Sequence, residues 1–257
     1  MMRFGKMIEE RYSRTAMLIG EDGVNRLRSS RVAVFGAGGV GGFAIEALAR
    51  CGVGAIDIFD DDKVSVSNLN RQIIALGSTV GMHKADAAAA RIADIDESIR
   101  VNAVRMFFIP ENADQVDFSR YDAVIDAIDT VSGKLEIIMR AKAAGCFVIS
   151  AMGAGNKLDP LKLTVCDIYE TSVCPLARVM RRELRKRGVK ELKVVYSTEE
   201  ALTPIEIDAD RGSDNEESPL RKGTPKKNPP GSISFVPSAA GLIAASETVK
   251  FLLSACR

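Results

Sequence analysis

Hydrophobic and polar positions follow two kinds of pattern along the first 151 residues. Apolar runs of four to eight residues alternate with longer stretches in which apolar residues recur every three or four positions. The runs predict buried strands at 32–35, 55–59, 101–107, 121–128 and 146–151. The longer stretches predict helices at 20–30, 43–51, 80–94 and 133–145. Strands that alternate with helices indicate a parallel sheet that binds ligands at the carboxyl ends of its strands.

The pattern changes after residue 151. Further strands are expected at 161–170, 193–196 and 232–236, and further helices at 175–188 and 239–253. Residues 208–231 are rich in Asp, Glu, Ser, Lys, Gly and Pro, which predicts an exposed, mobile loop. We therefore expect one α/β domain over residues 1–257. Its Rossmann-like, mostly parallel sheet is extended by antiparallel C-terminal strands and carries helices on both faces.

A glycine-rich turn follows the first predicted strand. Gly36, Gly38 and Gly41 have the spacing G-x-G-x-x-G between a strand and a helix, the context in which this spacing binds nucleotides. The first glycine permits a tight turn, the second lets the backbone approach a phosphate, and the third lets the helix pack closely. The second strand ends at Asp60, where an acidic side chain meets a ribose hydroxyl in such folds. A nucleotide site is expected, and a turn used only for packing is the alternative.

Two cations follow this acidic position. Arg71 lies in the segment 67–72, and Lys84 lies near the start of the helix predicted at 80–94. A dehydrogenase has no evident use for them there, whereas cleavage of a triphosphate requires fixed cations around the phosphates. The pair favours ATP over NAD. By itself, Arg14 in the polar N-terminal segment is interpreted as a solvated cation.

Composition excludes several mechanisms. The net charge of +1 gives no overall attraction to nucleic acid or membranes, and the single His83 cannot form a His-based triad or a multi-His metal site. Five Cys without a C-x-x-C pair suggest reduced thiols in a cytoplasmic protein. No signal peptide is evident at the N-terminus. The apolar C-terminal helix could be mistaken for a membrane span, but Glu247 and Lys250 favour a docked helix.

Several segments together resemble the ubiquitin-activating-like adenylyltransferases. The matching segments are 11–14, 36–41, 60–62, 67–72, Lys84 and Asp129. The resemblance covers residues 11–151, which we expect to bind the nucleotide, and leaves 152–257 as the half that faces the substrate. It implies adenylation of a carboxylate by ATP on a homodimeric, eight-stranded sheet.

The resemblance also implies particular roles for residues. The expected nucleotide-binding residues are Gly36, Gly38, Gly39, Gly41, Asp60, Asp62, Asn68, Arg71, Gln72, Lys84 and Asp129. Among these, Asp60 holds the ribose and Asp129 lies near Mg²⁺, while Asn68, Arg71 and Lys84 hold the phosphates. The expected catalytic residues are Arg14, Arg71, Lys84 and Asp129. In this interpretation Arg14 reaches into the partner subunit's site. Fixed cations agree with the chemistry, because attack of a carboxylate on the α-phosphate brings two anions together.

A local excess of positive charge lies in the C-terminal half. Residues 178–193 contain eight basic and two acidic residues. Four of the basic residues recur at helical spacing on one face: Arg178, Arg181, Arg182 and Arg185. Basic helices are commonly just solvated faces, but this excess suits a phosphate backbone. We expect RNA, and not DNA, as the partner of this face, and the family resemblance implies that this RNA is tRNA.

Two departures from family patterns narrow the expected function. The paired C-x-x-C motifs of zinc-binding carrier-protein activators are absent, and the loop 208–231 has no Cys that could accept an acyl group. Cys174 is the one candidate thiol, and a buried structural role is favoured for it. These features are similar to family members that activate the carboxylate of a threonylcarbamoyl group on a tRNA adenosine and then close a ring with loss of water.

Three alternatives remain open at this point. The first is an adenylyltransferase that activates the C-terminus of a small sulfur-carrier protein. The second is a non-catalytic nucleotide-binding scaffold that recruits sulfur-transfer partners, against which the intact Arg14, Arg71, Lys84 and Asp129 argue. An NAD-dependent dehydrogenase is the third. Whether a cysteine desulfurase system binds the chain also stays open.

Overall fold

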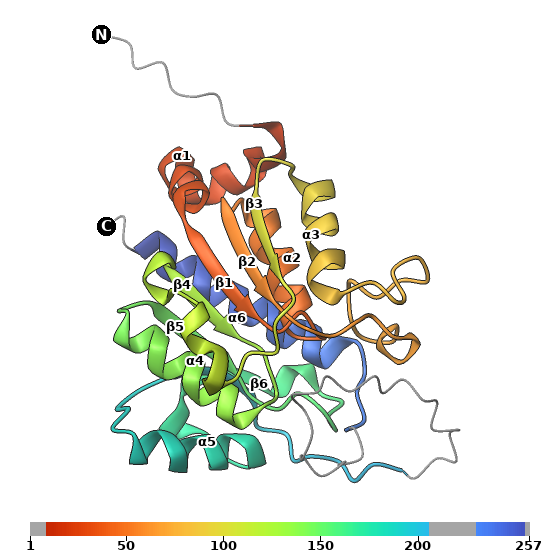
Figure 1. The fold of residues 1–257 in the computed structure, drawn as a ribbon, viewed down its shortest axis with the longest axis vertical. Coiled ribbons are helices and arrows are strands. Elements are labelled where there is room, and N and C mark those ends of the chain that lie inside the picture. Colours follow the sequence, from red (N-terminus) through yellow and green to blue (C-terminus); the bar gives the residue numbers. More distant parts are fainter. Residues whose placement is uncertain (1–8, 206–229, 255–257) are drawn as a thin grey trace.

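A computed structural model describes residues 9–205 and 230–254, built around one seven-stranded sheet (Figure 1). The strands are β1 (Arg31–Phe35), β2 (Ala55–Phe59), β3 (Arg100–Val104), β4 (Ala123–Asp126), β5 (Phe147–Ala151), β6 (Leu163–Asp167) and β7 (Lys193–Ser197). Their spatial order is β3-β2-β1-β4-β5-β7-β6. Only β6 runs antiparallel to its neighbour, and β7 pairs in parallel with β5. The predicted α/β class and mostly parallel sheet are confirmed.

Helices cover both faces of the sheet. They are α1 (Ser13–Ser29), α2 (Gly41–Cys51), α3 (Lys84–Ile95), α4 (Val131–Ala143), α5 (Pro175–Lys186) and α6 (Phe235–Ser254). One core joins buried side chains of α1, α2, α3 and α6 to β1, β2, β4 and β5. The second core joins α4 and α5 to the other face. This two-sided burial explains why the central strands are continuous apolar runs.

The strand predicted at 232–236 is wrong. No strand forms between residues 230 and 235, and α6 begins at Phe235. Pro237 lies in the first turn of this helix, where its missing N–H has no intrahelical partner to lose. The described part of the chain therefore contributes seven strands to the sheet, not the eight that the resemblance implies. The predicted mobile loop 208–231 lies almost wholly outside the described residues.

The C-terminal helix α6 is docked against α2. Of the described helices, it alone is long and apolar enough to cross a membrane. A Cβ atom on Gly241 would lie 2.1 Å from the carbonyl oxygen of Val40, so the two backbones are in direct contact. Ala240, Ala244 and Leu252 are buried in the same interface region. Close backbone packing of this kind agrees with the docked helix expected from the sequence.

The N-terminal helix is longer than predicted and has a break in its middle. It begins at Ser13, seven residues before the predicted start, and Gly20 has φ 73° and ψ 171° within it. Positive φ is readily adopted by glycine and costs other residues free energy. The buried residues of α1, Gly23, Val24 and Leu27, all follow the break. The half that precedes Gly20 therefore has no buried residue of its own.

Candidate functional site

The glycine turn lies between the carboxyl ends of β1, β2 and β4. Gly36 has φ 89° and donates its N–H to the carbonyl oxygen of Phe59 at 2.8 Å. A Cβ atom on Gly41 would lie 1.7 Å from the carbonyl oxygen of Gly36. Tight packing alone therefore accounts for Gly36 and Gly41.

Gly38 and Gly39 are not explained in the same way. A Cβ on Gly38 would approach only Gln72 Nε2, at 3.9 Å, so packing does not require a glycine at this position. A Cβ on Gly39 would lie 3.2 Å from Pro237 Cβ and 3.5 Å from Arg71 Cγ. The space above Gly38 thus lies between the glycine turn and the segment that carries Gln72. Such exposed backbone before a helix suits the close approach of a phosphate.

Asp60 joins the ends of β1 and β2. Its Oδ2 accepts the N–H of Ala37 at 2.7 Å and its Oδ1 accepts the N–H of Asp62 at 2.9 Å. Burial raises the pKa of Asp60, against a lowering by the nearby ammonium of Lys84. The carboxylate is therefore held at the end of β2 beside the glycine turn, where a ribose hydroxyl is expected.

Lys84 is buried at the first residue of α3. Its ammonium forms an ion pair with Asp62 at 2.7 Å, and its backbone N–H donates to the carbonyl oxygen of Asp62 at 2.9 Å. The structure thus shows a contact of Asp62 that the sequence did not reveal. Asp62 holds Lys84, which is predicted to bind phosphate. Among the described His, Cys, Asp and Glu residues, Asp60, Asp61 and Asp62 form the one group of three or more whose ligand atoms all lie within 4.8 Å of one another. Asp129, the residue predicted to lie near Mg²⁺, is not among them.

Arg71 and Gln72 follow a short 3-10 helix, Val66–Asn68. Asn68 is buried, and its Oδ1 accepts the N–H of Ser65 at 3.1 Å. The carbonyl oxygen of Asn68 accepts the N–H groups of Arg71 at 3.1 Å and Gln72 at 3.0 Å. Asn68 therefore shapes the turn that positions Arg71 and Gln72, two predicted site residues, a role that its predicted contact with phosphate did not include.

Arg71 and Gln72 both have polar groups whose partners in the described chain are incomplete. The Arg71 guanidinium donates to the Ser67 carbonyl oxygen at 2.9 Å and to Asn70 Oδ1 at 3.0 Å, and it has no carboxylate partner among the described residues. Burial lowers the pKa of Arg71. Gln72 is 6% exposed, and its buried Oε1 has no hydrogen-bond partner in the described part of the chain. A partly desolvated cation without a counter-ion and a buried unpaired acceptor both favour a polar, anionic ligand here.

Asp129 lies on the exposed loop that follows β4. Among the described residues, its carboxylate receives only a long contact from the Thr130 hydroxyl, at 3.5 Å. The loop starts near the glycine turn, because a Cβ on Gly36 would lie 2.9 Å from the carbonyl oxygen of Ala127. The structure therefore brings the Asp129 segment to the edge of the sheet that carries the glycine turn.

A buried charged network supports this loop, and sequence reasoning missed it. Lys134 and Asp126 are both fully buried and form an ion pair at 2.9 Å. Lys134 Nζ also donates to the carbonyl oxygens of Ile128 at 3.1 Å and Ala151 at 2.8 Å. The Ser150 hydroxyl donates to Asp126 at 2.5 Å. The available signal was the position of Lys134 three, four and seven residues before buried Ile137, Ile138 and Ala141 on α4.

Arg14 lies far from these residues within the same chain. It is exposed on the first turn of α1, and the described residues offer it no hydrogen bond or ion pair. The preceding Tyr12 packs on Gly52, just before β2 begins, whereas the glycine turn follows the end of β1. Figure 1 shows α1 at the end of the sheet where the parallel strands begin. Since a five-residue strand is about 17 Å long, Arg14 does not reach the nucleotide site of its own chain.

The four predicted tRNA-binding arginines lie on one face of α5. Together with Lys186 they line a hollow of about 430 Å³, while Ala177, Met180 and Leu184 face the core. Arg178 and Arg182 are exposed. Arg181 donates to the Thr171 carbonyl oxygen at 2.8 Å, and Arg185 stacks 5.1 Å above the Tyr169 ring. The common face predicted from helical spacing is confirmed, but two of its cations also have structural contacts.

The remaining candidate side chains have packing roles. Cys174 is 3% exposed and precedes α5, in agreement with the predicted structural thiol. The other described cysteines, Cys51, Cys146 and Cys166, are also free. His83 is half-buried before α3, and its Nδ1 is shielded from solvent.

These features define an anion-binding, Rossmann-like site, and comparison with known proteins places the chain in a family. The chain belongs to the ThiF family, which it matches over residues 12–256. It is 44% identical to the tRNA threonylcarbamoyladenosine dehydratase of Bacillus subtilis over 243 residues, which are 94% of each chain. Its fold matches that of the Escherichia coli tRNA N6-threonylcarbamoyladenosine dehydratase in complex with AMP, with a TM-score of 0.82 and 32% identity over 96% of this chain and 95% of that one. The E. coli enzyme in complex with ATP matches with a TM-score of 0.80 at the same identity and coverage.

Proposed function

We propose that this chain uses ATP to adenylate the carboxylate of threonylcarbamoyladenosine in tRNA and then allows the group to cyclise. The observation that carries this proposal is the half-buried Arg71 guanidinium, which has no carboxylate partner in the described chain and lies beside the open glycine turn. A fixed cation beside exposed backbone N–H groups suits a triphosphate. The similarity over almost the whole length to enzymes with this name supports the choice of substrate.

The reaction divides into two steps. In the first, a carboxylate oxygen of the substrate forms a bond to the α-phosphorus of ATP, and the bond to the β-phosphate breaks to release pyrophosphate. In the second, a nucleophile within the threonylcarbamoyl group attacks the activated carbonyl and AMP leaves with the former carboxylate oxygen. Because the second step is intramolecular, it requires no enzyme thiol. The buried Cys174 agrees with this chemistry.

Each residue of the site supplies binding or charge. In the proposed arrangement, Asp60 holds the ribose hydroxyls, and Arg71 and Lys84 offset the charge of the phosphates. Asp62 keeps the Lys84 ammonium at the end of β2. Mg²⁺ would bind near Asp129, whose exposed carboxylate is free of strong partners in the described chain. Its chemistry there would be the neutralisation of charge on the phosphates.

The proposed tRNA contact is the α5 face of Arg178, Arg181, Arg182 and Arg185. Its hollow is lined only by cationic residues, and it lies on a helix whose other face is buried. Contacts between such a face and phosphates are independent of sequence, so the face would hold tRNA without choosing among bases. A cytoplasmic location stays a prediction from the sequence, and binding of a cysteine desulfurase stays an open alternative.

The proposed active form is a homodimer in which Arg14 completes the partner subunit's site. Arg14 lies at the opposite end of its own sheet, which supports action in trans. Met17 and Leu18, 83% and 87% exposed, lie three and four residues further along α1 and share its face. Mixing an Arg14→Ala subunit with an Asp129→Ala subunit should restore one complete site per heterodimer. Inactive heterodimers would contradict this arrangement.

The decisive experiment incubates the protein with ATP, Mg²⁺ and tRNA that carries threonylcarbamoyladenosine. Mass spectrometry of the nucleosides should show a product lighter by one water, formed with AMP and pyrophosphate. Unchanged tRNA would refute the proposal. The alternative activity on a carrier protein is tested in parallel by pyrophosphate exchange, which should be stimulated by modified tRNA and not by a carrier with a Gly-Gly C-terminus.

A further inference from the structure

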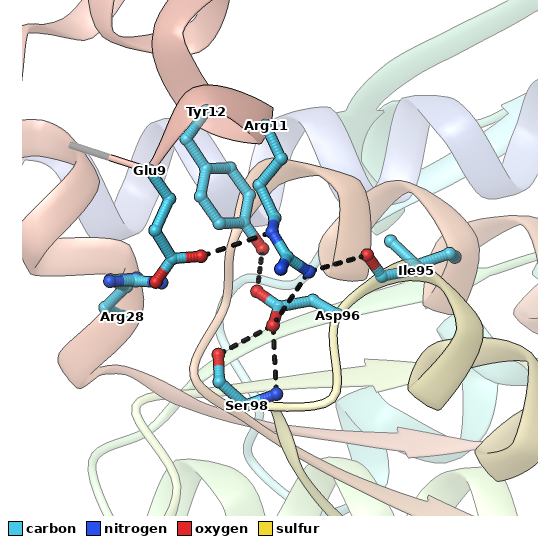
Figure 2. Close-up of polar contacts among 7 residues, drawn as sticks. All are labelled: Glu9, Arg11, Tyr12, Arg28, Ile95, Asp96 and Ser98. Carbon is cyan, nitrogen blue, oxygen red and sulfur yellow. Dashed lines mark hydrogen bonds and ion pairs between the residues drawn. The ribbon is translucent and has the colours of Figure 1, made fainter.

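A buried polar cluster holds the segment that precedes Arg14 (Figure 2). The Tyr12 hydroxyl donates to a carboxylate oxygen of Asp96, and both side chains are 2% exposed. The other oxygen of Asp96 accepts from Ser98, at 2.9 Å from its N–H and 2.7 Å from its hydroxyl. Arg11 Nη1 lies 3.2 Å from the same carboxylate and donates to the Ile95 carbonyl oxygen at 3.0 Å. Asp96 is therefore fully bonded, and Tyr12 is one of its principal partners.

Charged groups on both sides of the ring complete the cluster. Glu9 accepts from Arg28 and lies 3.2 Å from Arg11 Nε. The Arg28 guanidinium lies 5.4 Å from the centre of the Tyr12 ring. Figure 2 shows that these side chains converge from the N-terminal segment, from the last turn of α1, which carries Arg28, and from the turn after α3. The cluster thus fastens the start of α1 to a second element that is distant in sequence.

The start of α1 needs its own anchor because of the break at Gly20. Residues 13–19 precede the break and include no buried residue; Ile19 is the one hydrophobic side chain among them that packs partly against the core. The buried contacts of Val24 and Leu27 orient only the half that follows the break. The direction of Arg14, two residues after Tyr12, is consequently set by the cluster.

The helix that precedes Asp96 also carries a predicted residue of the nucleotide site. Asp96 directly follows α3, and Lys84 is the first residue of that helix. The helix has 12 residues and is about 18 Å long at 1.5 Å per residue. The element that presents Lys84 at one end therefore holds the Arg14 segment at the other end.

We propose that Tyr12 and Asp96 are positioning residues, which act on the reaction by fixing the direction in which α1 carries Arg14. This inference rests on the proposed function of Arg14 in the partner's site. Neither residue touches a substrate. The loss of the Tyr12 hydroxyl should misplace Arg14 without altering Arg71 or Lys84, so the turnover number should fall and the KM for ATP should stay unchanged. A small misplacement of a catalytic group is enough for a large loss of rate.

The test is a double-mutant cycle on the full-length protein. Tyr12→Phe is expected to lower kcat about tenfold or more at saturating ATP and tRNA. In the Arg14→Ala background the same change should have no further effect, because the misplaced group is already absent. Asp96→Asn should give the same pattern, and it takes the place of Tyr12→Phe if that protein does not fold.

The chain contains a matched control for the loss of a tyrosine hydroxyl. Tyr121 is also buried, donates to Asp57 at 2.9 Å and lies beneath Arg31 at 5.7 Å. Tyr121→Phe removes the same kind of bond away from α1, so it should destabilise the fold comparably and leave kcat unchanged.

Four results would overturn the inference. An equal loss of kcat in Tyr121→Phe, or additive effects of Tyr12→Phe and Arg14→Ala, would assign Tyr12 a role in stability alone. Wild-type kcat in Tyr12→Phe, with Arg14→Ala inactive, would refute the positioning role while the proposed function stands. Full activity of Arg14→Ala would instead refute the proposed role of Arg14, and the positioning role with it.

Discussion

Replacing Lys134 with Met tests whether the buried network at the end of β4 supports both the fold and the site. The substitution keeps most of the side-chain volume but removes the ammonium group, which has three acceptors: Asp126, Ile128 and Ala151. It leaves the Asp126 carboxylate fully buried, with the Ser150 hydroxyl as its remaining close partner. Removal of one partner from a buried ion pair costs about 3–5 kcal/mol. For a protein of this size, we expect the midpoint of thermal unfolding to fall by roughly 6–20 °C.

Urea unfolding followed by circular dichroism measures the loss of stability, with the slope of the transition as a check on two-state behaviour. Lys142→Met is the matched control, because Lys142 is half-buried on the same helix and has no ion pair among the described residues. It should change stability by no more than about 1 kcal/mol. The double variant Lys134→Met with Asp126→Asn should be more stable than Lys134→Met alone, because a neutral amide is less costly to bury than an unpaired carboxylate.

The same substitution should also reduce activity under conditions in which the protein is folded. Lys134 joins the Ile128 carbonyl to the end of β5, and Asp129 is the next residue of that loop. We therefore expect slower pyrophosphate exchange from folded Lys134→Met than from Lys142→Met. The reasoning is refuted if Lys134→Met loses less than about 1 kcal/mol, or if the double variant is as unstable as the single one.

Three further predictions concern the nucleotide, tRNA and pH. Arg71→Ala and Lys84→Ala should each lower turnover by about 100-fold or more with little change in the folding of Arg71→Ala, and near-normal rates in both would exclude them as phosphate ligands. The double variant Arg178→Glu with Arg182→Glu should bind tRNA more weakly, with unchanged affinity for ATP. The slope of the logarithm of tRNA affinity against the logarithm of salt concentration should fall by roughly one per lost phosphate contact. Identical slopes for the wild type and the variant would show that the face is only solvated. This pair is preferred because Arg181 and Arg185 also contact Thr171 and Tyr169. Burial raises the pKa of Asp96, but the hydrogen bonds from Tyr12 and Ser98 outweigh it and leave that pKa below its ordinary value. The stabilisation by Asp96 is therefore complete above about pH 4 and is lost as the pH falls further. In thermal unfolding from pH 7 to pH 2.5, the wild type should lose more stability than Asp96→Asn. Parallel curves of the two proteins would contradict a stabilising role of the Asp96 carboxylate.

The sequence by itself determined the features that depend on neighbouring residues. The order of strands and helices follows from local periodicity, and the glycine turn is specified by Gly36 and Gly41, which the structure allows no side chain. The common face of the α5 arginines follows from the 3.6-residue repeat. Even the error at 232–236 was local in origin, because a short apolar segment before a proline can be either an edge strand or the first turn of a helix.

Only the tertiary structure decided which distant residues meet. Strand β7 pairs with β5 and runs parallel to it, and α6 brings Pro237 against Gly39. The partners of buried charges could not be predicted from the sequence either. In the sequence Lys134 is an ordinary helical lysine, and in the structure Asp126 and two carbonyl groups at the strand ends surround it. Likewise, Arg14 belongs to a motif in the sequence, but the buried hydrogen bond that joins the nearby Tyr12 to Asp96, 84 residues away, is seen only in the folded chain. Burial of a charge requires partners, and the folded chain draws those partners from segments whose separation in sequence carries no signal of their proximity.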